Sequence, residues 1–152
     1  MAIRFFSDGI SFQLEGKRKI TQWLKRVAAE EGKKAGSLCY IFVSDDILLD
    51  INKKYLQHDY YTDIITFDDS VGDAISGEMY ISIDTVKSNA RDYHADFRNE
   101  LLRVMVHGVL HLCGHKDKTA GEQLEMRAAE AKYMDWFIAA RPSLHPVLTA
   151  VL

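Results

Sequence analysis

The sequence predicts an α+β domain, in which a small mixed β-sheet is packed with about five helices. Three observations lead to this prediction. Long segments carry apolar residues at helical spacing, whereas short segments alternate with period two or form continuous runs of apolar β-formers. Hydrophobic residues make up 47% of the chain, enough to fill one core. The 152 residues include only two prolines and no serine- or glycine-rich stretch, so we expect residues 1–152 to form a single domain.

The N-terminal part is expected to contain two short strands, a helix and a central strand. Ile3–Phe6 and Ile10–Leu14 have β patterns, the second alternating with period two. Lys17–Glu31 carries apolar residues at helical spacing, and Gly32 is placed to end that helix. Leu38–Val43 is a near-continuous apolar run of β-formers, which predicts the central strand.

The rest of the chain alternates between helices and strands. Ser44-Asp45-Asp46 supplies an N-cap for a helix with apolar residues between positions 47 and 55. Ile64–Phe67 and Met79–Ile83 are the next expected strands, separated by a polar loop over residues 68–77. The last elements are helices: Asp84 to about Tyr93, Phe97 to Cys113 with Gly114 at its end, and about Ala120 to Ala139 before Arg141-Pro142.

Charge and cysteine content narrow the class of function and the compartment. The net charge of −3 favours neither nucleic-acid nor membrane binding, so an RNA partner would need a local basic patch or a metal. Cys39 and Cys113 are too few for a disulfide framework, which favours a reducing compartment. The N-terminus lacks the apolar core of a secretion signal, and no apolar run approaches the roughly 18 residues of a membrane span. We therefore expect a cytoplasmic protein without a membrane partner.

The segment from residue 100 to residue 117 carries the residues with the most specific chemistry. Its middle part is apolar almost all round, as in a helix buried inside a domain. At ~100° per residue, Glu100, Arg103, His107 and His111 fall on one face of that helix. Because unpaired polar groups are costly to bury, we expect these four side chains to have hydrogen-bonding, ionic or metal partners. Two histidines four residues apart can bind one divalent ion, as in the zinc-site helix of the zincins.

A third ligand is expected from beyond Gly114, which can adopt a positive φ and reverse the chain. Two residues compete for this role. His115 gives His-x3-His-x3-His, but it directly follows the glycine and has little chain with which to return. Asp117 gives His-x3-His-x5-Asp, has the slack of a further turn, and offers a carboxylate that zinc accepts. We favour Asp117.

Other interpretations of the same residues remain open. His107 and His111 can be core histidines bonded to the backbone or to Glu100, and Arg103 can be a salt-bridge partner of Glu100 instead of a catalytic residue. Gly108 stands where zinc peptidases with His-Glu-x-x-His carry their general base, which disfavours peptide hydrolysis.

The motifs resemble those of the YbeY family of metal-dependent endoribonucleases, also called rRNA maturation factors. The family signature His-Gly-x-Leu-His-Leu-x-Gly-x-Asp-His is similar to the run from His107 to Asp117. Residues 51–67 resemble the family block Leu-Asn-x-x-Tyr-Arg-x-x-Asp-x-Pro-Thr-Asp-Val-Leu-Ser-Phe, and Gly77–Ser82 resembles the strand between the two blocks. The resemblance covers about Leu48 to Tyr133.

The resemblance implies one Zn²⁺ per chain and a single-strand-specific endoribonuclease that acts in ribosomal RNA processing and ribosome quality control. It implies RNA as the substrate and components of the small ribosomal subunit as candidate partners. His107 and His111 match the first two metal ligands of the family, and Asp117 stands at the third, where the family has histidine. An anionic third ligand would make the metal a weaker Lewis acid.

A second departure from the family concerns phosphate binding. The family arginine that follows the tyrosine is Leu56 here, and its contact with phosphate is lost. His58, Lys116, Lys118 and Arg103 are candidates to replace it, and of these His58 and Arg103 are the candidate catalytic residues. The alternative for His58 is that it is an exposed loop residue. Four other residues of the second block either shape the turn or touch the substrate: Tyr55, Asp59, Thr62 and Asp63.

Three protein ligands would leave one metal position open for water. The ion would lower the pKa of that water toward ~7 and polarise a phosphodiester oxygen, so that either the water or the 2′-OH of the RNA attacks. One alternative is a non-catalytic ribosome-assembly factor with a structural metal. Another is a different metalloenzyme with two histidines and one carboxylate, such as a non-haem iron oxygenase.

Overall fold

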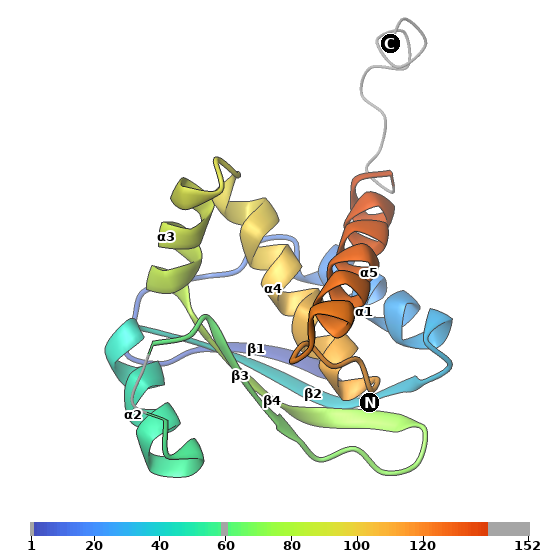
Figure 1. Cartoon of the computed structure of the whole chain (residues 1–152), viewed down its shortest axis with the longest axis horizontal. Helices are drawn as coiled ribbons and strands as arrows, with labels where there is room; N and C mark the ends of the chain where they lie inside the picture. Colours follow the sequence, from blue (N-terminus) through green and yellow to red (C-terminus); the bar gives the residue numbers. More distant parts are fainter. Residues whose placement is uncertain (1, 59–60, 140–152) are drawn as a thin grey trace, which may run out of the picture.

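A computed structural model describes residues 2–58 and 61–139, and within these ranges it has four strands and five helices (Figure 1). The strands are β1 (Ile3–Ser7), β2 (Lys34–Val43), β3 (Ile64–Asp68) and β4 (Ala74–Ser82). The helices are α1 (Lys17–Glu30), α2 (Asp45–Leu56), α3 (Ile83–Asp92), α4 (Phe97–Leu112) and α5 (Ala120–Ala139). The predicted α+β fold with a small mixed sheet is therefore confirmed.

The four strands form one sheet in the order β1-β2-β4-β3. β1 and β4 both pair with β2 in parallel, while β3 pairs with β4 antiparallel and forms an edge of the sheet. β2 is central, as its apolar run predicts, because its alternate residues are buried on both faces. It begins at Lys34, earlier than the sequence pattern predicts.

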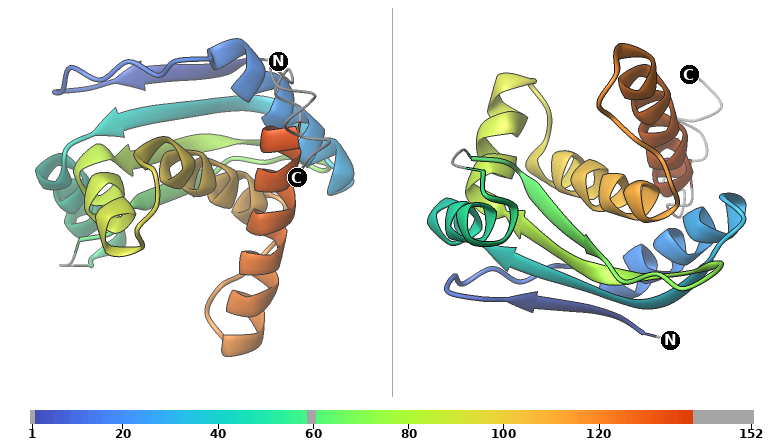
Figure 2. Two further views of the ribbon diagram at one scale, coloured as in Figure 1. Left: turned by 90° about the horizontal axis from the view of Figure 1, so that it is seen from above. Right: turned by 60° about the horizontal axis from the view of Figure 1, so that its bottom comes forward.

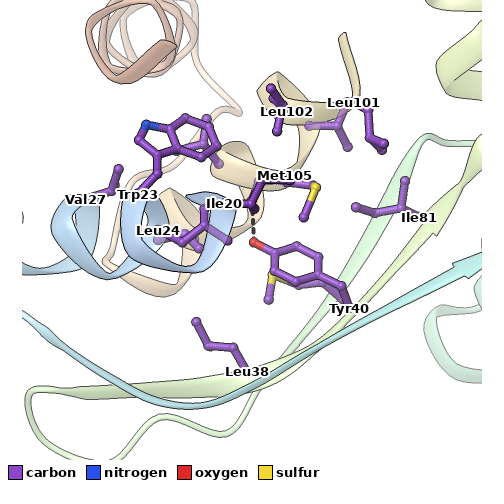
Figure 3. Packing of buried hydrophobic residues seen from close by; sticks show 14 of the residues in the cluster. Ile20, Trp23, Leu24, Val27, Leu38, Tyr40, Ile81, Leu101, Leu102 and Met105 are labelled. Atoms are coloured by element: carbon purple, nitrogen blue, oxygen red, sulfur yellow. Dashed lines mark hydrogen bonds between the residues drawn. The ribbon is translucent and has the colours of Figure 1, made fainter. Parts of the chain in front are cut away.

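Helices cover the two faces of the sheet unequally. Residues of α1, α3, α4 and α5 pack on one face around a large core, and α4 lies across that face (Figures 1 and 2). The Tyr40 hydroxyl donates to the Met105 carbonyl at 2.7 Å, which ties β2 to α4 (Figure 3). The other face carries α2 over a smaller cluster that includes Leu48 and Ile65. Because α4 is buried by the sheet and by other helices, the helix from Glu100 to Leu112 approaches the surface only at Arg103, His107 and His111.

Two predicted features are wrong. Ile10–Leu14 is not a strand, since it pairs with no other strand in the described part of the chain. Its alternation arises because Leu14 is buried and Phe12 packs edge-on against Phe42, with ring centroids 5.1 Å apart. The predicted loop over residues 68–77 is shorter, because β4 already begins at Ala74. Asp59 and the Arg141-Pro142 pair lie outside the described residues.

Candidate metal centre

His107 and His111 lie on the half-exposed face of α4. The N-cap of the helix is Asp96, whose side chain accepts a hydrogen bond from the Arg98 backbone amide at 3.2 Å. The side chains of His107 and His111 are 17% and 31% exposed. Their ring centroids are 4.6 Å apart and the ring planes are nearly perpendicular. Spacing by four residues has therefore placed both imidazoles beside the same small space, as the sequence predicts.

The chain reverses directly after α4 and brings Asp117 back to these histidines. Gly114 has a φ of +106°, and the His115 amide donates to the Leu110 carbonyl at 3.0 Å. The next helix begins at once, because Thr119 and Glu122 exchange side-chain to backbone hydrogen bonds at the N-terminus of α5. Asp117 is therefore held in a short connection between two capped helix ends.

The three residues present donor atoms at a spacing that suits a zinc ion. Asp117 Oδ2 lies 3.4 Å from His107 Nε2 and 3.3 Å from His111 Nε2, and all three ligand atoms lie within 4.8 Å of one another. A tetrahedral ion with bonds of about 2.0–2.1 Å separates its ligands by roughly 3.3–3.4 Å. Two imidazole nitrogens and one carboxylate oxygen are also donors that zinc accepts. The residues present fit the metal that the family resemblance implies.

A buried carboxylate on α5 holds the other nitrogen of His107. Glu130 Oε2 lies 2.6 Å from His107 Nδ1, and Glu130 is 2% exposed. Burial raises the pKa of Glu130, but the hydrogen bond to His107 and the charge of Arg103 outweigh it, so the net pKa is lowered. Because a carboxylate only accepts, the proton belongs on Nδ1 and the lone pair on Nε2 faces Asp117.

Arg103 connects this carboxylate to a second one. Its Nε and Nη2 donate to the two oxygens of Glu100 at 2.9 and 2.7 Å, and its Nη1 donates to Glu130 Oε1 at 2.9 Å. These bonds raise the pKa of Arg103. The Arg103–Glu100 pair considered from the sequence is present, and the guanidinium also forms part of a pocket wall beside His107.

The other predicted residues lie in different places. His115 points away from the centre, since its Nε2 lies 2.6 Å from Glu31 Oε1, and Glu31 also accepts from the Tyr133 hydroxyl. His58 follows α2, where its amide donates to the Asn52 carbonyl at 3.1 Å. His58, Leu56 and Lys118 line the same pocket as the three candidate ligands, whereas Lys116 is exposed and lines none of the pockets described here.

Two pockets adjoin the candidate ligands and share the walls formed by Asp63, His107 and Asp117. The smaller has a volume of about 310 Å³ and lies between the end of α3, α4 and α5. The larger, of about 630 Å³, lies along β3 and the end of α2. The candidate metal ligands therefore stand between two hollows, and an extended ligand that crosses them would occupy both.

Glu130 is a site residue that the sequence reasoning missed, whereas Asp63 was considered only as a residue that shapes the turn or touches the substrate. Glu130 shares the face of α5 that buries Met126, Tyr133 and Phe137, and a carboxylate within such an apolar stripe was an available signal. Asp63 directly precedes β3, and its Oδ2 lies 4.0 Å from Arg103 Nη2. Burial raises the pKa of Asp63, although the charges of His107 and Arg103 oppose this.

Gly108 is required by the contact between α4 and the sheet. A Cβ at this position would lie 2.7 Å from Met79 Sδ and 3.0 Å from Ile64 Cδ1. A glutamate here would have no room and would face the sheet instead of the histidines. The packing of α4 therefore supports the argument against a peptidase of the His-Glu-x-x-His type.

Taken together, the fold and the site define an α+β protein with a candidate mononuclear metal centre on its buried helix. None of the helices in residues 2–58 and 61–139 is long and apolar enough to cross a membrane. The family model described as "Endoribonuclease YbeY" matches residues 5–137.

Individual relatives agree with this match. Proteins named "Endoribonuclease YbeY" from Bacteroides thetaiotaomicron and Phocaeicola vulgatus are 49% and 54% identical to the chain, covering 87% and 81% of it and 96% and 94% of their own lengths. The solution structure of TM1509 from Thermotoga maritima is similar with a TM-score of 0.62 and 27% identity, over 90% of this chain and 89% of that one. The chain belongs to the endoribonuclease YbeY family, which confirms the resemblance.

Proposed function

We propose that this chain is a zinc-dependent endoribonuclease that cuts single-stranded RNA and acts in ribosomal RNA processing. The observation that carries the proposal is the convergence of His107, His111 and Asp117 between two pockets, at ligand separations that suit a tetrahedral ion. The names of the relatives support RNA cleavage. Residues 1–152 would form one hydrolase domain, and the two free cysteines are consistent with a cytoplasmic location.

His107, His111 and Asp117 would hold the metal. When bound there, Zn²⁺ would act as a Lewis acid toward a phosphodiester oxygen and lower the pKa of water. The remaining work belongs to the chain itself. Glu130 holds His107 in one tautomer, and Arg103 holds Glu130 in place through a charge-assisted hydrogen bond. Arg103 is thus assigned a positioning role.

The larger pocket supplies groups for the phosphate backbone. His58 and Lys118 line this pocket together with His107, His111 and Asp117. Leu56 lines it as well, at the position where the family resemblance implies an arginine. We therefore assign the phosphate contact of that missing arginine to Lys118 and His58, whose side chains lie at the same pocket. Components of the small ribosomal subunit are the proposed macromolecular partners.

The proposal is tested by metal content and cleavage measured on the same samples. His107→Ala and His111→Ala are expected to remove stoichiometric zinc, measured by elemental analysis, and to abolish cleavage of single-stranded ribosomal RNA fragments. His94→Asn, which changes an exposed histidine on the loop between α3 and α4, is the matched control and retains both. Chelator treatment of the native chain should reproduce the two alanine variants, and added zinc should restore cleavage.

Other outcomes separate the alternatives. Cleavage by a metal-free double variant would refute the metal mechanism. Stoichiometric zinc without cleavage of any precursor or mature ribosomal RNA would favour an assembly factor with a structural metal. Iron in the freshly purified protein, with activity that depends on an oxo-acid, would favour a non-haem oxygenase.

A further inference from the structure

We propose that the smaller pocket is a binding site for one unpaired nucleotide beside the scissile phosphate, with Tyr93 as the stacking surface for its base and Arg127 as the partner of its phosphate. This inference rests on the proposed function, because it assumes RNA as the substrate. It adds residues that neither the metal-site motif nor the family blocks contain, since they lie at the end of α3 and on the outer face of α5.

The position and size of the pocket favour a single nucleotide. His107 and Asp117 form part of its wall, so its occupant lies directly next to the candidate metal ligands. Its volume of about 310 Å³ is near the lower limit for small-molecule sites, roughly 300 Å³. A base can enter such a hollow only when it is unpaired, because a paired base is covered by its partner strand and its stacked neighbours. The pocket would therefore select single-stranded RNA.

Tyr93 is placed as a stacking surface. It is the C-cap residue of α3, where its backbone amide donates to the Asn89 carbonyl at 2.9 Å, and it lines the pocket. The side chain is 56% exposed although it is a large aromatic residue. Among the described residues no aromatic ring packs against it. An exposed ring at the edge of a pocket can receive the face of any base.

Arg127 and Gln123 line the pocket from the exposed face of α5, one helical turn apart. Arg103, the other arginine of this pocket, is already bonded to Glu100 and Glu130. In the described part of the chain, by contrast, no carboxylate forms an ion pair with Arg127. Its guanidinium therefore remains available for a phosphate, which it can bind in a bidentate manner. The Gln123 amide offers both a donor and an acceptor to a base edge.

The charges of the inner wall favour a nucleotide over a free anion. The carboxylates of Asp63, Asp117 and Glu130 line the pocket toward the metal centre and outnumber the one guanidinium on that wall, that of Arg103, so a bare phosphate is disfavoured there. A neutral base with exocyclic amino groups meets no such repulsion. The arrangement therefore places the base inside, against Tyr93, and the phosphate outside, at Arg127.

The test measures binding and cleavage of short oligoribonucleotides by zinc-loaded protein. Tyr93→Ala is expected to weaken binding of a non-cleavable single-stranded RNA about tenfold, measured by fluorescence anisotropy, while Tyr93→Phe binds like the native chain because it keeps the ring. In cleavage assays the loss should appear in KM, with kcat little changed. Arg127→Gln should weaken binding several-fold and reduce its salt dependence by about one phosphate contact.

Matched controls and one substrate variant make the test specific. Phe6→Ala removes an aromatic residue of β1 that is 51% exposed and lines neither of the two site pockets, and Arg18→Gln removes an exposed arginine of α1; both should bind RNA normally. An abasic site moved along the RNA should, at one position beside the cleaved bond, abolish the difference between the native chain and Tyr93→Ala.

The outcomes separate this site from the proposed function. If the native chain cleaves RNA and Tyr93→Ala matches it in binding and KM, the nucleotide site is refuted and the proposed function stands. If the native chain binds RNA through Tyr93 but never cleaves it, the proposed function fails and the site stands. Equal binding of duplex and single-stranded RNA by the native chain would also overturn the site.

Discussion

Two histidine–carboxylate pairs lie near the end of α4 and differ in which ring nitrogen they use. His107 meets Glu130 and His115 meets Glu31, each at 2.6 Å. His107 uses Nδ1 for this contact, which leaves Nε2 facing Asp117 at 3.4 Å. His115 uses Nε2 and faces α1 instead. The same two types of side chain therefore orient a proposed metal ligand at His107 and hold the loop after α4 against α1 at His115.

The surroundings of the two glutamates explain this difference. The Glu130 side chain is 3% exposed and is shared between His107 and Arg103, so it can neither move nor lose its charge without cost. The Glu31 side chain is 20% exposed and meets the neutral hydroxyl of Tyr133 as its second partner. We infer that changes at the first pair affect both metal binding and folding, while changes at the second affect folding alone.

The largest expected contrast is between Asp117 and His115 as third ligand. Asp117→Ala is expected to lower zinc affinity more than about 100-fold, beyond the range of substitutions outside the ligand shell. Asp117→His, which introduces the family's residue, should keep the site. His115→Ala should leave the affinity near the native value, because its ring is engaged by Glu31. Competition titration with a zinc-sensitive dye measures all three, and a larger loss in His115→Ala than in Asp117→Ala would reverse the assignment.

The next effect concerns the first pair itself. Glu130→Ala leaves His107 Nδ1 and Arg103 Nη1 without their partner in a partly buried place, and is expected to lower the free energy of unfolding by about 3 kcal/mol. It should also lower zinc affinity roughly 10- to 100-fold. Glu130→Gln keeps an acceptor for His107 and should lose less of both quantities. Native zinc affinity in a folded Glu130→Ala protein would show that the pair does not orient the ligand.

The contrast between the two pairs also shows what the sequence could predict. Helical spacing was enough to place His107 and His111 together, because both lie on one element. The turn at Gly114 was enough to favour Asp117 over His115 as the third ligand, because only Asp117 is far enough along the chain to return to the histidines. Glu130 could not be assigned to His107 in this way, since their contact depends on how α5 packs against α4, and no local pattern encodes that packing. The strand prediction for Ile10–Leu14 failed for a related reason. A segment buried at every second residue has the sequence pattern of a strand even where no partner strand pairs with it.

The smallest effect is expected at the second pair, and its pH dependence has a defined direction. Burial raises the pKa of Glu31, but the hydrogen bonds from Tyr133 and His115 outweigh it, and the net pKa lies below the ordinary value of 4.5. A carboxylate with a lowered pKa stabilises the fold above its ordinary pKa, and this contribution is lost as the pH falls through the lowered value. Glu31→Gln should therefore reduce the free energy of unfolding by about 1 kcal/mol at neutral pH, with a gap to the native chain that closes in acid. Urea unfolding of both proteins across the acid range measures this difference in the free energy of unfolding. Titrating groups that behave alike in both proteins do not contribute to the difference. A gap that stays constant with pH, or a loss of zinc affinity like that of Glu130→Ala, would mean that the two pairs do not differ in the way described.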